Sequence, residues 1–184
     1  MPGITHSRPD GTAMREVMAR VPTGVAIVTT RDVHGDHHGM TVSSFCSVSL
    51  DPPLVLVCLA KSARCYAAFA DSGRFAVSVL GDQQAAIARR FASKNIDKFA
   101  PGGLVSTPSG ELVVDGALAT LECVVDNRHD AGDHVITVGE IAHLTLAERG
   151  RPAVYCNRAF TTVGPPVHPI PEVPHAHADP ADHR

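Results

Sequence analysis

An unbroken apolar run, Leu54 to Leu59, follows directly on the chain breaker Asp51-Pro52-Pro53. Successive side chains of a strand point to opposite faces, so a run that is apolar at every position needs apolar cover on both sides. Two prolines at its start also end any pairing that continues from the preceding segment. We therefore expect Leu54 to Leu59 to be the most buried strand of a closed or covered β-sheet.

The rest of the chain also favours strands over helices. Apolar and β-branched runs between polar turns predict strands over 25–30, 40–50, 75–80, 117–125, 134–146 and 153–163. Apolar residues at helical spacing predict a helix behind an N-cap at Thr12, and further helices near 66–70 and 82–92. Turns are expected at 31–38, 127–133 and 148–152, and a long loop, a candidate lid, at 93–110. This order predicts a mainly β fold, an antiparallel barrel with a few peripheral helices.

Length and composition set the domain organisation. The 184 residues, with 44% hydrophobic content, suit one folded domain. We expect a flexible N-terminus over 1–11, the domain over 12–164, and a disordered tail rich in proline and histidine over 165–184. The tail should be dispensable for activity.

Charge and hydropathy argue against several partners and compartments. The net charge of −3 comes from residues spread along the chain, which makes a nucleic-acid partner unexpected. There is no apolar run of membrane-spanning length, and the N-terminus lacks a signal pattern, so a cytoplasmic protein without a membrane partner is expected. The five cysteines form neither a CxxC pair nor zinc-finger spacing, so we expect reduced thiols and no metal site.

The absence of several sequence motifs argues against whole classes of enzyme. The chain contains no GxGxxG, no GxxxxGK[ST], no HExxH and no GxSxG. Dinucleotide-binding Rossmann folds, P-loop NTPases, zincins and α/β-hydrolases are therefore disfavoured.

The segment from Thr41 to Ser49 is unusually rich in hydroxyls. Strand alternation would place Thr41, Ser43, Phe45, Ser47 and Ser49 on one face. Two interpretations stay open on this pattern: an edge strand with a solvated hydroxyl face, or a strand whose hydroxyls and N–H groups bind a planar heterocycle and a phosphate.

Histidines offer a second candidate group. A single histidine that enters a strand, as His134 does after Gly132-Asp133, is more often a structural residue than a catalytic one. His34, His37 and His38 fall in an expected turn, and the remaining cluster lies in the tail, so both groups are interpreted as solvated.

With these segments in order, the chain resembles the flavin reductase-like family of FMN-binding split barrels, which includes reductase components of two-component flavin monooxygenases. The resemblance covers roughly residues 12 to 163. It is carried by the opening strand Val21 to Thr30, by Thr41 to Leu59 with Ser62, by Phe75 to Leu80, by Arg90-Phe91-Ala92, Asp97-Lys98-Phe99 and Gly102, and by Leu121-Glu122-Cys123, Gly132 to Ile141 and Tyr155.

The resemblance implies a split β-barrel and a flavin site. An isoalloxazine ring would lie against 41–47 and 57–59, with its phosphate near Ser62, Ala63 and the helix at 89–92, where Arg89, Arg90 or Lys98 could neutralise it. His134 would bind and orient the nicotinamide, with Asp133 fixing its tautomer. The cofactor-binding residues implied are Thr41, Ser43, Ser44, Cys46, Ser47, Cys58, Leu59, Ser62, Ala63, Arg89, Phe91, Ala92, Lys98 and Tyr155. Cys156-Asn157-Arg158 departs from the family pattern, which indicates a remodelled nicotinamide wall.

The same resemblance implies an NAD(P)H:flavin oxidoreductase. FMN or FAD would be reduced by NADH or NADPH and released to a partner monooxygenase, and the chain would form a homodimer. Two alternatives stay open: a flavin carrier or redox module without rapid turnover, and an oxidase of the pyridoxamine-phosphate type or a deazaflavin-dependent reductase on the same barrel.

Overall fold

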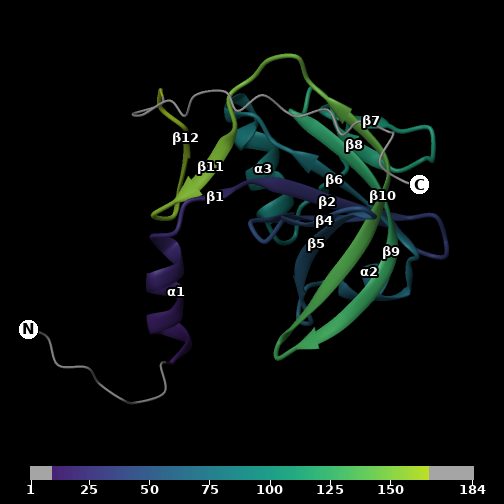
Figure 1. Ribbon diagram of the computed structural model, residues 1–184, viewed down its shortest axis with the longest axis horizontal. Coiled ribbons are helices and arrows are strands. Elements are labelled where there is room, and N and C mark those ends of the chain that lie inside the picture. The colour runs from purple at the N-terminus through teal and green to yellow at the C-terminus, as the bar shows by residue number, and fades with distance from the viewer. Residues whose placement is uncertain (1–9, 166–184) are drawn as a thin grey trace, which may run out of the picture.

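A computed structural model describes residues 10–165, and its centre is a seven-stranded antiparallel sheet (Figure 1). In spatial order the strands are β3 (His37–Val42), β2 (Ala26–Arg31), β6 (Arg74–Val79), β9 (Ala119–Ala131), β10 (His134–Leu146), β5 (Pro53–Ala60) and β4 (Cys46–Leu50). The edge strands β3 and β4 are consecutive in the chain, so the short segment 43–45 draws the two ends of the sheet together. The sheet therefore curls into a barrel that is split between β3 and β4, which confirms the expected fold class.

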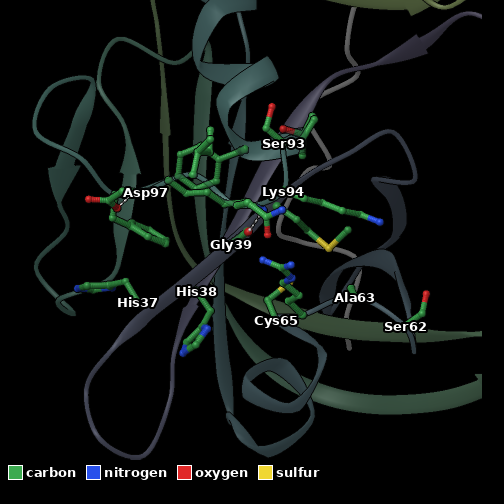
Figure 2. Close-up of a pocket in the computed structure, with 18 residues that line it drawn as sticks. His37, His38, Gly39, Ser62, Ala63, Cys65, Ser93, Lys94 and Asp97 are labelled. Atoms are coloured by element: carbon green, nitrogen blue, oxygen red, sulfur yellow. Dashed lines mark hydrogen bonds between the residues drawn. The ribbon is translucent and has the colours of Figure 1, made fainter.

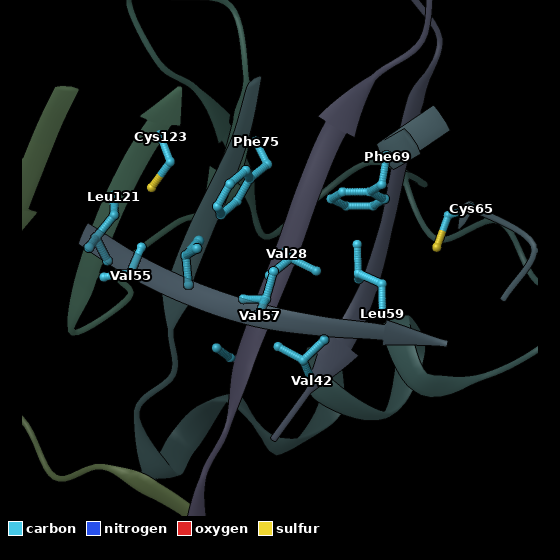
Figure 3. Close-up of a cluster of buried hydrophobic side chains, with 12 residues drawn as sticks. Val28, Val42, Val55, Val57, Leu59, Cys65, Phe69, Phe75, Leu121 and Cys123 are labelled. Carbon is cyan, nitrogen blue, oxygen red and sulfur yellow. The ribbon is translucent and has the colours of Figure 1, made fainter. Parts of the chain in front are cut away.

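The barrel interior is filled by side chains from β2, β3, β5, β6 and β9. Figure 3 shows Val28 and Val42 facing Val57 and Leu59 across this interior. Val28 and Val57 are fully buried, and Phe75 is 1% exposed. Their burial is the main source of the barrel's stability.

Smaller elements cover the outside of the barrel. β1 (Thr23–Gly24), β11 (Ala153–Cys156) and β12 (Ala159–Thr162) form one sheet, and β7 (Leu104–Ser106) pairs with β8 (Leu112–Val114). The helices are α1 (Gly11–Ala19), α2 (Tyr66–Asp71), the 3₁₀ turn η1 (Asp82–Gln84) and α3 (Ala85–Ala92). Through Ala88 and Phe91, α3 joins a second apolar cluster with β2, β8 and β11.

The prediction that Leu54 to Leu59 is the most buried strand is wrong. In β5 only Val55, Val57 and Leu59 are buried, whereas the residues between them are half-buried. β2 and β6 are buried along almost their whole length because other elements cover them outside the barrel. β5 lies next to the edge strand β4, and its outer face receives no such cover from the described residues.

The single strand expected over 40–50 is also wrong. The chain leaves the ladder at Ser43 to Phe45, where the Ser44 hydroxyl accepts from the Cys58 N–H at 3.0 Å and donates to the Cys58 carbonyl at 3.2 Å. These side-chain bonds continue the pairing of β4 with β5 at the position where the backbone ladder ends. The expected continuous hydroxyl face is therefore absent.

Several boundaries differ for local reasons. β9 runs through the turn expected at 127–133, and the hairpin closes at Gly132, whose φ of 63° needs a glycine. The strand expected over 153–163 is a hairpin that reverses at Asn157 and Arg158, both with positive φ. The loop expected over 93–110 contains β7.

The N-terminal helix is capped by Asp10, whose carboxylate accepts from Thr12 N and Ala13 N, and not by Thr12 as expected. The apolar stripe of α1 is exposed, with no buried residue in the helix. No helix in the described part of the chain is long and apolar enough to cross a membrane. The expectations for most of the N-terminus and for the tail with its histidines fall on residues 1–9 and 166–184, outside the described residues.

Candidate flavin and nicotinamide site

A cavity of about 660 Å³ lies between β3, the turn that leads into α2, and the segment that follows α3 (Figure 2). It is lined by residues 37–41, 62–65 and 91–99. Its volume falls within the range of small-molecule sites. The cavity therefore makes this side of the barrel the candidate site.

Close packing between β3 and α3 forms the floor of the cavity. The Thr41 hydroxyl donates to the Ala88 carbonyl of α3 at 2.6 Å. A Cβ on Gly39 would lie 2.8 Å from the Val28 carbonyl oxygen and 2.9 Å from a ring carbon of Phe91. Only glycine at position 39 therefore lets α3 sit this close to the strand.

The segment after α3 forms the opposite wall. Lys98 Nζ donates to the Gly39 carbonyl at 3.0 Å and so ties this wall to β3. The Asp97 carboxylate accepts from Phe99 N at 2.9 Å, and Asn95 has a φ of 62°. Asparagine tolerates this left-handed conformation better than most residues, which allows the sharp turn.

Positive charge gathers in the middle of the cavity lining. Arg64, Lys94 and Lys98 all line it. Ion pairs of lysine or arginine within residues 10–165 involve Arg31, Lys61 and Arg151, so Arg64 and Lys94 carry none there. Burial lowers the pKa of Lys98, and burial raises the pKa of the neighbouring Cys65 thiol. Exposed cations without ion pairs beside serine hydroxyls form a suitable environment for a phosphate.

The interpretation of His37 and His38 as solvated turn residues is wrong, because both belong to β3 and line the cavity. Burial lowers the pKa of His37, whose ring lies against Phe99 with ring centroids 5.8 Å apart. His38 Nε2 lies 2.9 Å from the Asp32 carboxylate, and this hydrogen bond lowers the pKa of Asp32. The polar composition around Gly35 predicted a turn that continues to His38, but the turn ends earlier and β3 begins at His37.

The predicted site residues fall into two groups. Thr41, Ser62, Ala63, Phe91, Ala92 and Lys98 line the cavity. Cavity residues that the sequence analysis did not assign include His37, Arg64, Cys65, Lys94, Asn95 and Phe99. The run Ser93-Lys94-Asn95 directly after a helix was the available signal for part of this set.

The other predicted residues lie outside the cavity. Ser43, Ser44, Cys46, Ser47 and Cys58 lie at the split of the barrel, on the segment joining β3 to β4 and on β4 and β5. The Leu59 side chain is 2% exposed and belongs to the barrel core. The Arg89 guanidinium lies 5.3 Å from the centroid of the Phe160 ring, which also contacts Tyr155, so these two predicted residues face β12.

His134 lies at the tip of the hairpin formed by β9 and β10. Its Nδ1 is 2.7 Å from the Asp133 carboxylate, and this hydrogen bond lowers the pKa of Asp133. His134 pairs with Ala60 in the ladder, and Lys61 N donates to the Asp133 carbonyl at 2.9 Å. His134 therefore lies opposite Ala60 in the sheet. Ser62, which lines the cavity, follows Ala60 by two positions in the chain. Within the described residues, no group of three or more metal-ligating side chains converges.

Comparisons with known proteins agree on one family. A family model described as "Flavin reductase like domain" matches residues 18–164. A Streptomyces coelicolor protein named actinorhodin polyketide dimerase is 51% identical over 150 residues, which cover 82% of this chain and 85% of the relative. The reductase subunit of a flavin-dependent monooxygenase from Rhodococcus jostii is 36% identical over 156 residues, 85% of this chain and 80% of that subunit. The solved structure of an NADH:FAD oxidoreductase from Streptomyces globisporus, in complex with NAD and FAD fragments, has a TM-score of 0.81 and 35% identity, covering 86% of this chain and 96% of that chain.

Proposed function

The chain belongs to the flavin reductase-like family, and on that premise we propose that it reduces FMN or FAD with NADH or NADPH at the cavity beside β3. The observation that carries the proposal is the combination of cations without ion pairs and hydroxyls in one cavity, with His134 opposite Ala60 on the strand that leads to it. The reduced flavin then leaves for a partner monooxygenase.

The residues present fit a flavin phosphate. Arg64 and Lys94 supply charge, the Ser62 hydroxyl supplies a donor, and Lys98 holds the wall in place through Gly39. From there the ring would extend past Ala63 toward the split of the barrel, where Ser43, Ser44, Cys46 and Cys58 lie. A bound flavin supplies a reversible hydride acceptor, which no amino acid side chain provides.

His134 would orient the nicotinamide on the open side of the ring. Asp133 accepts a hydrogen bond from its Nδ1, which leaves Nε2 as the ring nitrogen that can face a ligand. The protein's main contribution is to hold the two rings in contact and to exclude water, so proximity accounts for most of the acceleration. This requirement explains why no buried acid and base pair lines the cavity.

The open side of the ring also suggests how the chain assembles. The outer faces of β5 and β10 carry half-buried apolar pairs, Leu56 with Val138 and Cys58 with Ile136. Val48 on the adjacent β4 is 49% exposed. An apolar face of this kind favours association. We infer that a second copy of the chain covers it, which gives a homodimer with the flavin ring near the interface.

A second candidate function follows from the relative named for polyketide dimerisation. In this candidate the reduced flavin serves a reaction on a polyketide. Incubation of a polyketide substrate with this chain, flavin and NADH, with and without a flavin-dependent oxygenase, would separate direct action by this chain from action through an oxygenase.

The proposed function is tested by steady-state oxidation of NADH and NADPH with added FMN, FAD or riboflavin. We expect oxidation that depends on flavin and saturates with it. Arg64→Gln combined with Lys94→Gln should raise the KM for FMN but leave the KM for riboflavin, which lacks a phosphate, nearly unchanged. Equal effects on both flavins would contradict the phosphate assignment.

A further inference from the structure

The hairpin of β9 and β10 extends past the strand that flanks it. β6 pairs with β9 only from Ala119 to Val124. Beyond a single bond from Val125 N to the Gly73 carbonyl, residues 126–131 therefore have no strand on their outer edge within the described part of the chain. Helix α2 lies next to this length of the hairpin (Figure 1). A side chain of β9 can thus reach α2 directly.

Arg128 of β9 makes this contact. Its Nη2 donates to the Phe69 carbonyl at 2.9 Å and also to the Ser72 carbonyl. These carbonyls belong to the last turn of α2 and to its C-cap, where carbonyl groups lack partners within the helix and the helix dipole is negative. The guanidinium therefore satisfies the carbonyl end of α2 and balances its partial charge.

The rest of the Arg128 side chain lies against the inner face of the sheet. Arg128 pairs with Thr137, whose side chain is buried. Both residues border a void of only about 10 Å³, which is also lined by Leu59, Phe69 and Val135. The Nε atom is buried without a hydrogen-bond partner among the described residues. The side chain is thus confined to one place between the hairpin and α2.

The orientation of α2 matters because the helix directly follows the turn at 62–65, which lines the cavity. With six residues and no side-chain N-cap, α2 depends on tertiary contacts. Phe69 packs into the barrel core (Figure 3), and Arg128 holds the carbonyl end. Just before the turn, Lys61 N donates to the Asp133 carbonyl at 2.9 Å. The hairpin therefore holds the turn from both sides, through Asp133 before it and Arg128 after it.

We propose that Arg128 is a positioning residue for flavin binding, which acts through α2 to fix the turn at 62–65 so that Arg64 faces the flavin phosphate. The proposal rests on the proposed function, because that function places the phosphate at Arg64. Arg128 itself does not line the cavity. A lysine at this position would keep the charge, but its flexible stem lacks the fixed geometry of a guanidinium.

Equilibrium binding of FMN and of riboflavin, followed by flavin fluorescence, tests this role. We expect Arg128→Met to raise the Kd for FMN about three- to tenfold and to leave the Kd for riboflavin, which lacks the phosphate, within about twofold. Arg128→Lys should show a smaller rise, about twofold, for FMN alone. In an Arg64→Gln background, Arg128→Met should add less than about twofold, because Arg64 is the group through which it acts.

The matched control is Arg149→Met, which makes the same change of charge in the exposed segment between β10 and β11. It should leave both dissociation constants unchanged. Binding requires no nicotinamide, so this result stands apart from the proposed function. NADH-dependent reduction of riboflavin by the wild-type chain tests the proposed function separately.

Three outcomes would overturn the role of Arg128. The first is unchanged FMN binding in folded Arg128→Met. The second is an equal rise of both dissociation constants, which would mean that Arg128 serves only the fold. The third is an undiminished effect of Arg128→Met in the Arg64→Gln background, which would mean that it does not act through Arg64. If Arg128→Met does not fold, Arg128→Lys decides: a rise confined to FMN supports the role, whereas no rise, or an equal rise for both flavins, contradicts it.

Discussion

His134 is held at the hairpin tip by Asp133, outside the cavity that we assign to the flavin phosphate. We predict that His134→Ala lowers kcat/KM for the nicotinamide about ten- to hundred-fold, equivalent to roughly 1.4 to 2.7 kcal/mol of lost transition-state interaction. Flavin affinity should change little. His143→Ala, on the exposed far part of β10, should leave both quantities as they are. Unchanged nicotinamide kinetics in folded His134→Ala would return this histidine to a structural role.

The buried carboxyl of Glu111 should make the free energy of unfolding depend on pH. It is 3% exposed, and burial raises the pKa of its carboxyl above the usual 4.5, although Arg31 Nε lies 3.5 Å from Oε1. Between the unfolded and the folded pKa, the folded chain binds more protons, so this group makes the free energy of unfolding fall as pH rises. Glu111→Gln should therefore gain stability relative to wild type as the pH rises above the usual pKa of 4.5, measured by urea denaturation. Glu148→Gln, in an exposed turn, should show no such change; a constant difference for Glu111→Gln would refute the prediction.

Single residues were only partly predictable from the sequence. Ser62, Ala63 and Lys98 stand in segments that resemble the family, and the structure brings them to one cavity. His37 was missed because its neighbours Gly35 and Asp36 have the composition of a turn, while its cavity position depends on packing against Phe99, far along the chain. Contacts of this kind between distant segments are set by tertiary structure and leave no local pattern.

At the scale of elements, β10 bends where its register with β9 shifts, between Val138 and Gly139. A Cβ on Gly139 would lie 2.5 Å from a ring carbon of Phe75 and 3.0 Å from Cys123 Cβ. We predict that Gly139→Ala costs about 1 to 3 kcal/mol of unfolding free energy through overpacking. Gly73→Ala is the matched control, because nothing lies within 4 Å of its added Cβ. Equal midpoints of denaturation for Gly139→Ala and wild type would show that the barrel can adjust at this bend.

Strands were predicted well where a long apolar and β-branched run marks them. They were predicted poorly where pairing with another strand decides where a strand ends. The expected strand over 134–146 matches β10, which a long apolar and β-branched run supports. Its partner β9 continues through a polar segment, Asp126 to Asp130, because pairing with β10 satisfies its backbone groups even without apolar side chains. The break at Ser44 likewise depends on Cys58, on another strand, and not on local propensity.

At the scale of the whole molecule, we propose that the uncovered face over β4, β5 and β10 is the surface through which two copies of the chain associate. We predict a dimer in sedimentation experiments at micromolar concentration, and a monomer for Val48→Glu, since a buried carboxylate at the interface would lack a partner. Val33→Glu is the control: Val33 is 83% exposed and lies in the turn between β2 and β3. A wild-type monomer with full activity would refute the dimer.

The central claim is that this chain turns over flavin as a substrate, in contrast to a carrier that holds one flavin. The most direct test is anaerobic reduction of a large excess of free flavin by NADH or NADPH in the presence of a trace of the protein, followed by the loss of oxidised flavin absorbance. We predict that all of the flavin is reduced, at a rate proportional to protein concentration, without any oxygenase present. Reduction that stops at an amount of flavin equal to the protein, or that does not occur with either nicotinamide, would contradict the claim.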